Sequence, residues 1–168
     1  MIREISYHDS REYLNKFQKE EKSYGVDWYD CEDKDATYIW WIESEVISEN
    51  PLGFLSYKKM ILTNSIDFVY IVKIYVLKTH RSENPILIEG ERVSIILFKE
   101  LDKKEVNILT LESACTELDV YYKNLGFSYN KEISGEFSKS IGTSEKIMYR
   151  RKEDILFTDA ERNMFGEL

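Results

Sequence analysis

The chain has 168 residues, of which 43% are hydrophobic and 32% charged, and its formal net charge is −8. This length and composition predict one globular domain with a hydrophobic core. The acidic balance argues against a nucleic-acid-binding or membrane-surface protein, because both need a basic face. The two cysteines are far apart and form no CxxC motif, and no apolar stretch reaches membrane-spanning length. These features predict a reduced, cytoplasmic protein.

The N-terminal segment is expected to form a short strand followed by a helix. Residues 2–6 form the strand. Asp9 or Ser10 is a suitable N-cap, and the helix is expected to run to about Glu21. Its buried face carries Tyr13, Leu14 and Phe17.

A loop over residues 23–35 leads to two further strands. Residues 36–44 are rich in strand-forming side chains, and Asn50-Pro51 marks a turn into a third strand over residues 52–61. Trp40 and Trp41 point to opposite faces of the first of these strands, so at least one of them is expected in the core.

The stretch from residue 65 to residue 127 carries the clearest pattern. Residues 65–77 are apolar on both faces, which predicts a strand in the middle of a sheet. A helix beginning near Val93 and a strand over residues 106–113 follow. The helix over residues 117–125 is expected to end at Gly126, since glycine accepts the left-handed conformation past a helix end. Strand, helix and strand in succession predict a right-handed crossover between parallel strands.

The C-terminal part is expected to add two strands and a tail. The strands are predicted over residues 128–134 and 146–151, separated by a polar loop that carries Gly135 and Gly142. The predicted domain therefore spans residues 1–151. Apolar residues within 152–168 would pack this tail on the domain or on a partner chain, for instance in a homodimer.

One segment resembles a known family. Residues 121–127, YYKNLGF, are similar to the helix motif of the GNAT superfamily of N-acetyltransferases, and residues 49–60, ENPLGFLSYKKM, are similar to its third strand. The resemblance covers roughly residues 1–151. It implies an α/β fold, of the α+β kind, with a mixed, mostly antiparallel sheet and helices on both faces. It also implies a fourth and a fifth strand that are parallel and splay apart.

The resemblance implies acetyl-CoA as the co-substrate. In the family, the pantetheine arm lies between the splayed strands and pairs with the backbone of the fourth, here around Ile74, Tyr75 and Val76. Backbone N–H groups of that region polarise the thioester carbonyl. These contacts need no particular side chains, so the sequence permits them without demonstrating them.

The pyrophosphate-binding motif departs from the family pattern. The family has Arg or Gln, two residues, Gly, one residue, and then Gly or Ala at a helix start. Counting forward from Val76 places Arg81 at the basic position, but Asn84 and Ile86 replace the small residues. Counting back from the fifth strand places Gly90, with Glu91 beside it, at the last small position, but Pro85 and Ile88 replace the others.

Positive charges near the phosphates would come from Lys78, His80, Arg81 and Arg92. A solvated loop, with Gly90 serving helix-on-sheet packing, is the alternative.

Tyr122 is the best single catalytic candidate. It matches the family tyrosine that protonates the departing coenzyme A thiolate, and a phenol with a pKa near ~10 is protonated at neutral pH. The alternative is an aromatic side chain that only packs on the sheet. Asp67 and Glu45 are weak candidates for the base, since the family often uses water.

The remaining reactive side chains suggest less. Cys115 begins a predicted helix, where a thiolate would be favoured, but a small buried thiol is the commoner outcome. His8 and His80 are too few and too scattered for a metal site, so no metal is expected. The loop before the second strand is acidic, with Asp27, Asp30, Glu32, Asp33 and Asp35. In the family this loop borders the acceptor, so it would suit a cationic amine, whereas a solvated acidic loop is the bland alternative.

Two functions are therefore consistent with the sequence. The first is an N-acetyltransferase that transfers an acetyl or acyl group from acetyl-CoA to an amine of a small molecule or protein. The second is a non-catalytic GNAT-fold pseudoenzyme that serves as a binding or regulatory module. The retained Tyr122 favours the first, and the altered phosphate motif favours the second.

Overall fold

The computed structural model describes residues 1–25, 32–62 and 65–151. The chain forms two compact units that share strands β3 (Glu49–Ile61) and β4 (Asp67–Val76). The first unit comprises residues 1–58 and 72–104, and the second comprises residues 59–71 and the chain from 105 onward. The predicted tail, residues 152–168, lies outside the described residues. Its packing and the homodimer stay predictions.

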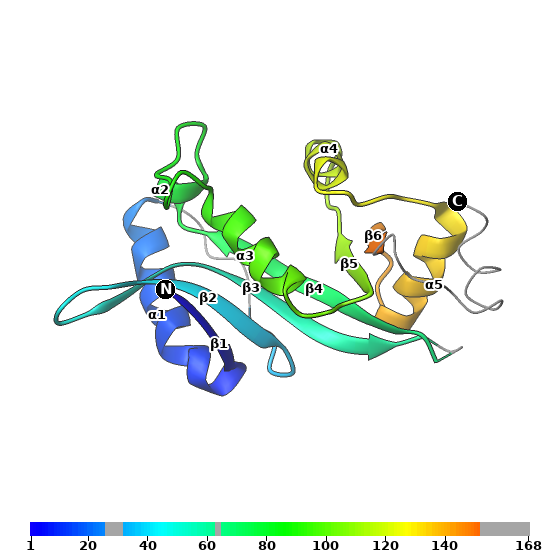
Figure 1. The fold of residues 1–168 in the computed structure, drawn as a ribbon, viewed down its shortest axis with the longest axis horizontal. Coiled ribbons are helices and arrows are strands. Elements are labelled where there is room, and N and C mark those ends of the chain that lie inside the picture. Colours follow the sequence, from blue (N-terminus) through cyan, green and yellow to red (C-terminus); the bar gives the residue numbers. More distant parts are fainter. Residues whose placement is uncertain (26–31, 63–64, 152–168) are drawn as a thin grey trace. The chain divides into compact units, whose positions relative to one another are not determined.

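The strands form a six-stranded mixed sheet in the order β1-β2-β3-β4-β5-β6 (Figure 1). The remaining strands are β1 (Ile2–Ser6), β2 (Thr37–Ser44), β5 (Ile108–Glu112) and β6 (Ile147–Arg151). The pairs β1–β2, β2–β3 and β5–β6 are antiparallel, whereas β4 and β5 are parallel. This arrangement confirms the predicted fold class and the predicted crossover between parallel strands.

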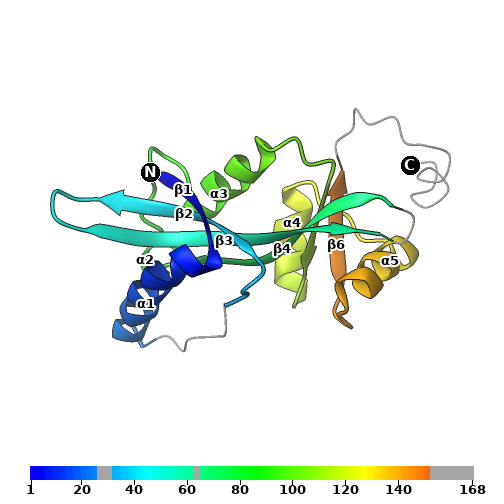
Figure 2. The ribbon, with the colours of Figure 1, turned by 90° about the horizontal axis from the view of Figure 1, so that it is seen from below.

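In the first unit, helices cover both faces of the strands β1–β3 (Figure 2). Helix α1 (Tyr7–Ser23) packs Phe17 against Trp40 and Phe54, with ring centroids 6.0 and 5.9 Å apart. Helix α3 (Val93–Asp102) lies on the other face, near Gly53, because neighbouring strand residues point to opposite sides.

The structure tests two predictions for the N-terminal part, the cap of α1 and the burial of a tryptophan. The cap of α1 is Ser6, whose Oγ accepts a hydrogen bond from the Asp9 N–H, so the predicted caps Asp9 and Ser10 are wrong and the helix begins earlier. The expectation that one tryptophan is core is confirmed. Trp40 is fully buried and donates its indole N–H to Ser10 Oγ at 2.9 Å, which satisfies both polar groups.

In the second unit, helix α5 (Lys131–Ile141) occupies the end of the predicted strand and most of the polar loop predicted after it, so the prediction of a loop at Gly135 is wrong. The prediction of a strand over residues 128–134 is wrong because Asn130 caps a helix: its side chain accepts from the N–H groups of Glu132 and Ile133. Ile133 and Phe137 are then four residues apart on one buried face. Phe137 packs on Phe68 of β4 and on Tyr149 of β6.

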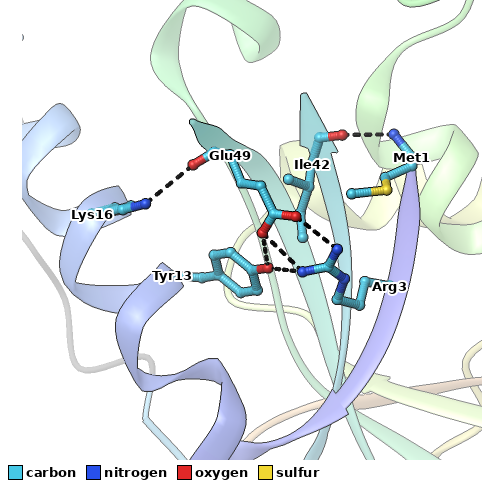
Figure 3. A network of polar contacts seen from close by, with 6 residues as sticks. All are labelled: Met1, Arg3, Tyr13, Lys16, Ile42 and Glu49. Carbon is cyan, nitrogen blue, oxygen red and sulfur yellow. Dashed lines mark hydrogen bonds and ion pairs between the residues drawn. The ribbon is translucent and has the colours of Figure 1, made fainter. Parts of the chain in front are cut away.

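A polar network joins β1, α1 and β3 in the first unit (Figure 3). Arg3 donates from Nη1 and Nη2 to the two carboxylate oxygens of Glu49, at 2.9 and 2.8 Å. Tyr13 donates its hydroxyl to Glu49 and accepts from Arg3. Hydrogen bonds from Arg3, and then from Tyr13, lower the pKa of Glu49 from 4.5 to about 2.

Acidification should therefore weaken the first unit. A depressed carboxyl pKa contributes stability that is complete above the unfolded value of 4.5 and is lost as the pH falls through about 2. We expect urea unfolding midpoints to fall between about pH 5 and about pH 2. The variant Glu49→Gln should be less stable near neutral pH and show a smaller loss over this window. An equal pH dependence in both proteins would contradict this assignment.

The close approach of β3 to β4 and α3 depends on Gly53. A methyl group added there would meet the Tyr75 carbonyl oxygen at 3.0 Å and Val93 Cγ1 at 3.1 Å. We expect Gly53→Ala to lower the free energy of unfolding by about 1–3 kcal/mol, since the nearest atom belongs to rigid backbone. The matched variant Gly135→Ala, in open space on α5, should raise it by about 0.5–1 kcal/mol. Chemical denaturation of both variants tests the pair, and a neutral Gly53→Ala would contradict it.

Candidate functional site

The segment after β4 begins with helix α2 (Lys78–Arg81), and it is organised around a carboxylate of α1. Glu21 is fully buried. Its Oε1 accepts the backbone N–H of Lys78 at 2.8 Å, and its Oε2 accepts Arg81 Nη1 at 2.8 Å. The Tyr75 hydroxyl donates to the same Oε2 at 3.3 Å. A buried charge is tolerated when it is paired and hydrogen-bonded in this way. We call Glu21, Tyr75, Lys78 and Arg81 the Glu21 cluster.

Arg81 makes further contacts within this cluster. Its Nη1 also donates to the Val76 carbonyl oxygen at 2.5 Å, and its guanidinium lies over the Tyr75 ring, 5.1 Å from the centroid. The sequence predicted Arg81 as a phosphate ligand. The structure instead places its charge against a carboxylate, a carbonyl and an aromatic face of its own chain.

Gly90 lies in a tight turn before α3. Glu89 and Gly90 have φ values of 49° and 82°, and Ile88 and Glu91 exchange backbone hydrogen bonds at 2.9 Å. Two positive φ angles between paired residues are typical of a type I′ turn. In the described part of the chain, a Cβ added at Gly90 would meet no atom within 4 Å, so the alternative of helix-on-sheet packing is wrong. Glu91 forms an ion pair with Lys99 of α3.

The residues after β4 do not fit a pyrophosphate as the family motif would hold one. The N–H groups of Lys78, His80 and Ile86 are donated to Glu21, Leu77 and Thr79 of the same chain, and Pro85 has no N–H. Arg81 is paired with Glu21. The N–H groups of these three residues and Arg81 Nη1 are thus committed to internal bonds.

The end of β4 offers main-chain groups on the side away from β3. The Leu77 N–H donates to the Leu52 carbonyl, and the Tyr75 carbonyl faces Gly53, so residues 75 and 77 direct their backbone toward β3. Ile74 and Val76 direct theirs to the other side, because backbone direction alternates along a strand. The ladder of β4 with β5 pairs residues 69–71 with 109–111, whereas β4 continues to Val76.

Tyr122 is positioned by the end of α4 (Thr116–Asn124) in the second unit. The Phe127 N–H donates to the Tyr122 carbonyl, and the Gly126 N–H to the Lys123 carbonyl, both at 3.0 Å, with Gly126 at φ 91°. This is a Schellman motif, and it explains why the segment YYKNLGF contains its glycine. Arg150 of β6 donates to the Leu125 carbonyl at 3.0 Å and fixes the same helix end.

The Tyr122 phenol is buried, and its ring packs at an angle on Phe127 with centroids 6.1 Å apart. Burial, followed by the neighbouring Tyr121 and Cys115, raises the pKa of Tyr122 to about 12. The phenol therefore stays protonated throughout the physiological range. It has the protonation state that a proton donor needs.

The first unit also contains a cavity of about 630 Å³ between α1, the turn joining β2 to β3, and α2. Leu52 and Leu77 contribute apolar walls, and Lys16 and Lys19 contribute charge. His80 is buried there, with Nδ1 bonded to Thr79 Oγ1 at 2.8 Å, and burial lowers its pKa, so the imidazole is neutral at pH 7. The predicted cofactor residues do not line this cavity. The part of α1 that lines it carries Lys16, Lys19 and Glu20, a charged pattern that does not by itself predict a cavity.

Other predicted residues have structural partners or exposed positions. Glu32 accepts from the Tyr7 hydroxyl, and Asp33 forms an ion pair with Lys58 at 3.0 Å, whereas residues 26–31, with Asp27 and Asp30, lie outside the described residues. Cys115 is exposed, so the expectation of a buried thiol is wrong.

The candidate bases Asp67 and Glu45 lie on β4 itself and in a turn. Asp67 begins that strand, and Glu45 lies in the turn between β2 and β3, where its carboxylate accepts from the Ser48 hydroxyl at 3.3 Å. Among residues 1–25, 32–62 and 65–151, no cluster of His, Cys, Asp and Glu could hold a metal ion. No helix in those ranges is long and apolar enough to cross a bilayer.

No family model and no curated protein sequence matches the chain. Solved structures match it at 10–15% identity. A GNAT-family acetyltransferase of Staphylococcus aureus Mu50 has a TM-score of 0.56 at 15% identity, covering 90% of this chain and 99% of that one. The NatB acetyltransferase complex bound to CoA and MES gives 0.55 at 14% identity, covering 90% and 98%. Arabidopsis thaliana NAA60 with a bisubstrate analogue gives 0.51 at 15%, covering 89% and 94%. The chain therefore has the GNAT acetyltransferase fold, which confirms the fold that the resemblance implied.

Removing the cation of the Glu21 cluster should destabilise the protein. In Arg81→Ala the buried carboxylate keeps only the Lys78 N–H and the Tyr75 hydroxyl as donors. We expect a loss of about 1–3 kcal/mol in the free energy of unfolding, since an uncompensated buried charge is costly. Arg92→Ala removes the same charge just before α3 and should stay within about 0.5 kcal/mol of the wild type. Equal urea midpoints for Arg81→Ala and wild type would contradict the role assigned to Arg81.

Proposed function

We propose that this chain is an acyltransferase that moves an acyl group, such as the acetyl group of acetyl-CoA, from a thioester to an amine. The observation that carries the proposal is the fold match over 90% of the chain to acetyltransferase structures, one of them bound to CoA. The thioester supplies an activated acyl group. The chain's own task is to hold it, to stabilise negative charge at the carbonyl oxygen and to provide a proton.

The backbone of β4 is the proposed binding element. The sequence pointed to Ile74, Tyr75 and Val76, and the alternation along the strand favours Ile74 and Val76, whose main-chain groups point away from β3. The Val76 carbonyl already accepts from Arg81, so the N–H and C=O of Ile74 and the N–H of Val76 are the proposed contacts. An N–H there would stabilise the developing oxyanion.

Tyr122 is the proposed acid. Its phenol would give its proton to the departing thiolate, and a pKa raised to about 12 keeps that proton in place at neutral pH. Water is the proposed acceptor of the amine proton, as in the family that the sequence resembles, which often uses water. The net charge of −8 favours a cationic amine as the acceptor.

A non-catalytic binding module is the second candidate, and a specific observation favours it. The Glu21 cluster commits Arg81 and the Lys78 N–H to an internal carboxylate, as would be expected of a chain that no longer binds a nucleotide at this place. Cofactor binding separates the two functions.

Calorimetry and thermal shift with acetyl-CoA test the proposal first. A ligand that binds only the folded protein stabilises it by about 2.7 kcal/mol at a concentration one hundred times its dissociation constant. A saturable rise in melting temperature, followed by acetylation of an amine in an acceptor screen, would support the acyltransferase. Absence of both binding and acetylation would leave the binding module.

Tyr122→Phe should separate binding from turnover. We expect kcat to fall by about 10²–10⁴-fold with the thioester affinity unchanged, because only the proton donor is lost. Tyr121→Phe, which removes the neighbouring hydroxyl, should leave kcat unchanged. In the wild type, kcat should show no loss from Tyr122 ionisation below about pH 11, given its raised pKa. Unchanged turnover in Tyr122→Phe would remove Tyr122 from the acid role.

A further inference from the structure

In the Glu21 cluster, a carboxylate of the protein binds the hydrogen-bond donors that follow β4. The Glu21 carboxylate accepts the first N–H of α2 and the Arg81 guanidinium, both at 2.8 Å. Backbone N–H groups and an arginine are the donors that proteins commonly direct at phosphate oxygens. Because these donors already bind a buried carboxylate, a phosphate could take them only by displacing Glu21 into a second position.

The surrounding charges also disfavour a phosphate here. Residues 78–92 carry three cations, Lys78, Arg81 and Arg92, and as many acids, Glu83, Glu89 and Glu91. Arg81 is paired with Glu21, and Glu91 with Lys99 of α3. A pyrophosphate carries several negative charges, and like charges at close range raise its free energy. The segment after β4 therefore has no excess of positive charge with which to attract the nucleotide end of coenzyme A.

The pantetheine end has different needs. Its amides require only main-chain N–H and C=O groups, and Ile74 and Val76 direct such groups away from β3 at the end of β4. Recognition of the arm therefore uses the backbone of β4, of which the Val76 carbonyl is bonded to the altered segment, through Arg81. The protein thus offers free hydrogen-bonding groups to the pantetheine end of the donor but few to its nucleotide end.

We propose that the acyl donor of this chain is a pantetheine thioester that is recognised through its pantetheine arm and not through its nucleotide. This inference rests on the proposed acyltransferase function and specifies the donor class. The amine nitrogen forms a bond to the carbonyl carbon and the carbon–sulfur bond breaks. The thiolate takes the proton of Tyr122, the nitrogen loses a proton to water, and water returns a proton to the Tyr122 phenolate, so an amide and a free thiol are the products.

Comparison of two donors tests the inference. S-acetylpantetheine and acetyl-CoA share the reacting thioester and the arm, and only acetyl-CoA carries the nucleotide. We expect kcat/KM values within about threefold of each other, because the remote nucleotide contributes no binding energy to the transition state. A preference for acetyl-CoA of about a hundredfold or more would overturn the inference while the acyltransferase function stands, since charge-assisted bonds to phosphate give such factors. Failure of both donors with every amine would overturn the acyltransferase function itself, and this inference with it.

A binding measurement that needs no turnover gives a second test. Inorganic pyrophosphate and adenosine 3′,5′-bisphosphate should not raise the melting temperature of the wild type. Glu21→Gln keeps the shape of the side chain and removes its charge, which frees the Arg81 cation, so pyrophosphate should stabilise this variant. Glu20→Gln makes the same charge change at a neighbouring carboxylate that accepts from the Tyr24 hydroxyl, and it should behave as the wild type.

The binding outcomes decide the inference even if Glu21→Gln fails to fold. Stabilisation of the wild type by either phosphate compound would show a working phosphate site, for instance at Arg92 and the start of α3, and would overturn the inference. No stabilisation of the wild type, together with donor values that agree within about threefold, would support it.

Discussion

The buried carboxylate of Glu21 is the constraint on which the first unit depends. A carboxylate buried away from water is stable only if hydrogen-bond donors surround it. The donors to Glu21 are Tyr75 at the end of β4 and Lys78 and Arg81 of α2. These contacts join α1 to α2 across β4. They also hold the Arg81 guanidinium over the Tyr75 ring and against the Val76 carbonyl. The position of the chain after β4 is thus determined by one side chain of α1.

Arg81 shows how structural and functional demands compete for one group. Its Nη1 is bonded to both Glu21 and Val76, so the same nitrogen satisfies a buried acid and a strand-end carbonyl. An arginine that contacts phosphate must turn its fork toward solvent and ligand. It cannot do both with the same atom. The internal carboxylate therefore has a clear physical consequence in the segment after β4. The Lys78 N–H and Arg81 Nη1 are bonded within the protein and are not available to a phosphate.

The sequence predicted those features that depend on local periodicity. The strand over residues 67–76 is apolar on both faces, and Leu125-Gly126-Phe127 predicts the helix end that the Schellman motif forms. A strand over residues 128–134 and then a loop are predicted where α5 forms, because that prediction does not use the Asn130 cap or the helical spacing of Ile133 and Phe137. Glu21 was missed as well. It continues the buried stripe of Ser10, Leu14 and Phe17 on α1, and a carboxylate at such a position indicates a buried partner, but its partners lie more than fifty residues away.

The two ends of the proposed donor illustrate why motif loss has unequal consequences. Phosphate binding depends on particular residues, because glycines permit close approach of the backbone and an arginine supplies charge. Binding of a pantetheine arm depends on an unpaired strand edge, which many side-chain sequences can build. Pro85 therefore removes one N–H donor for the nucleotide, and Asn84 and Ile86 replace small residues that would permit close approach, without touching the backbone of Ile74 and Val76. A chain under these substitutions can lose recognition of the nucleotide and still retain the geometry for acyl transfer.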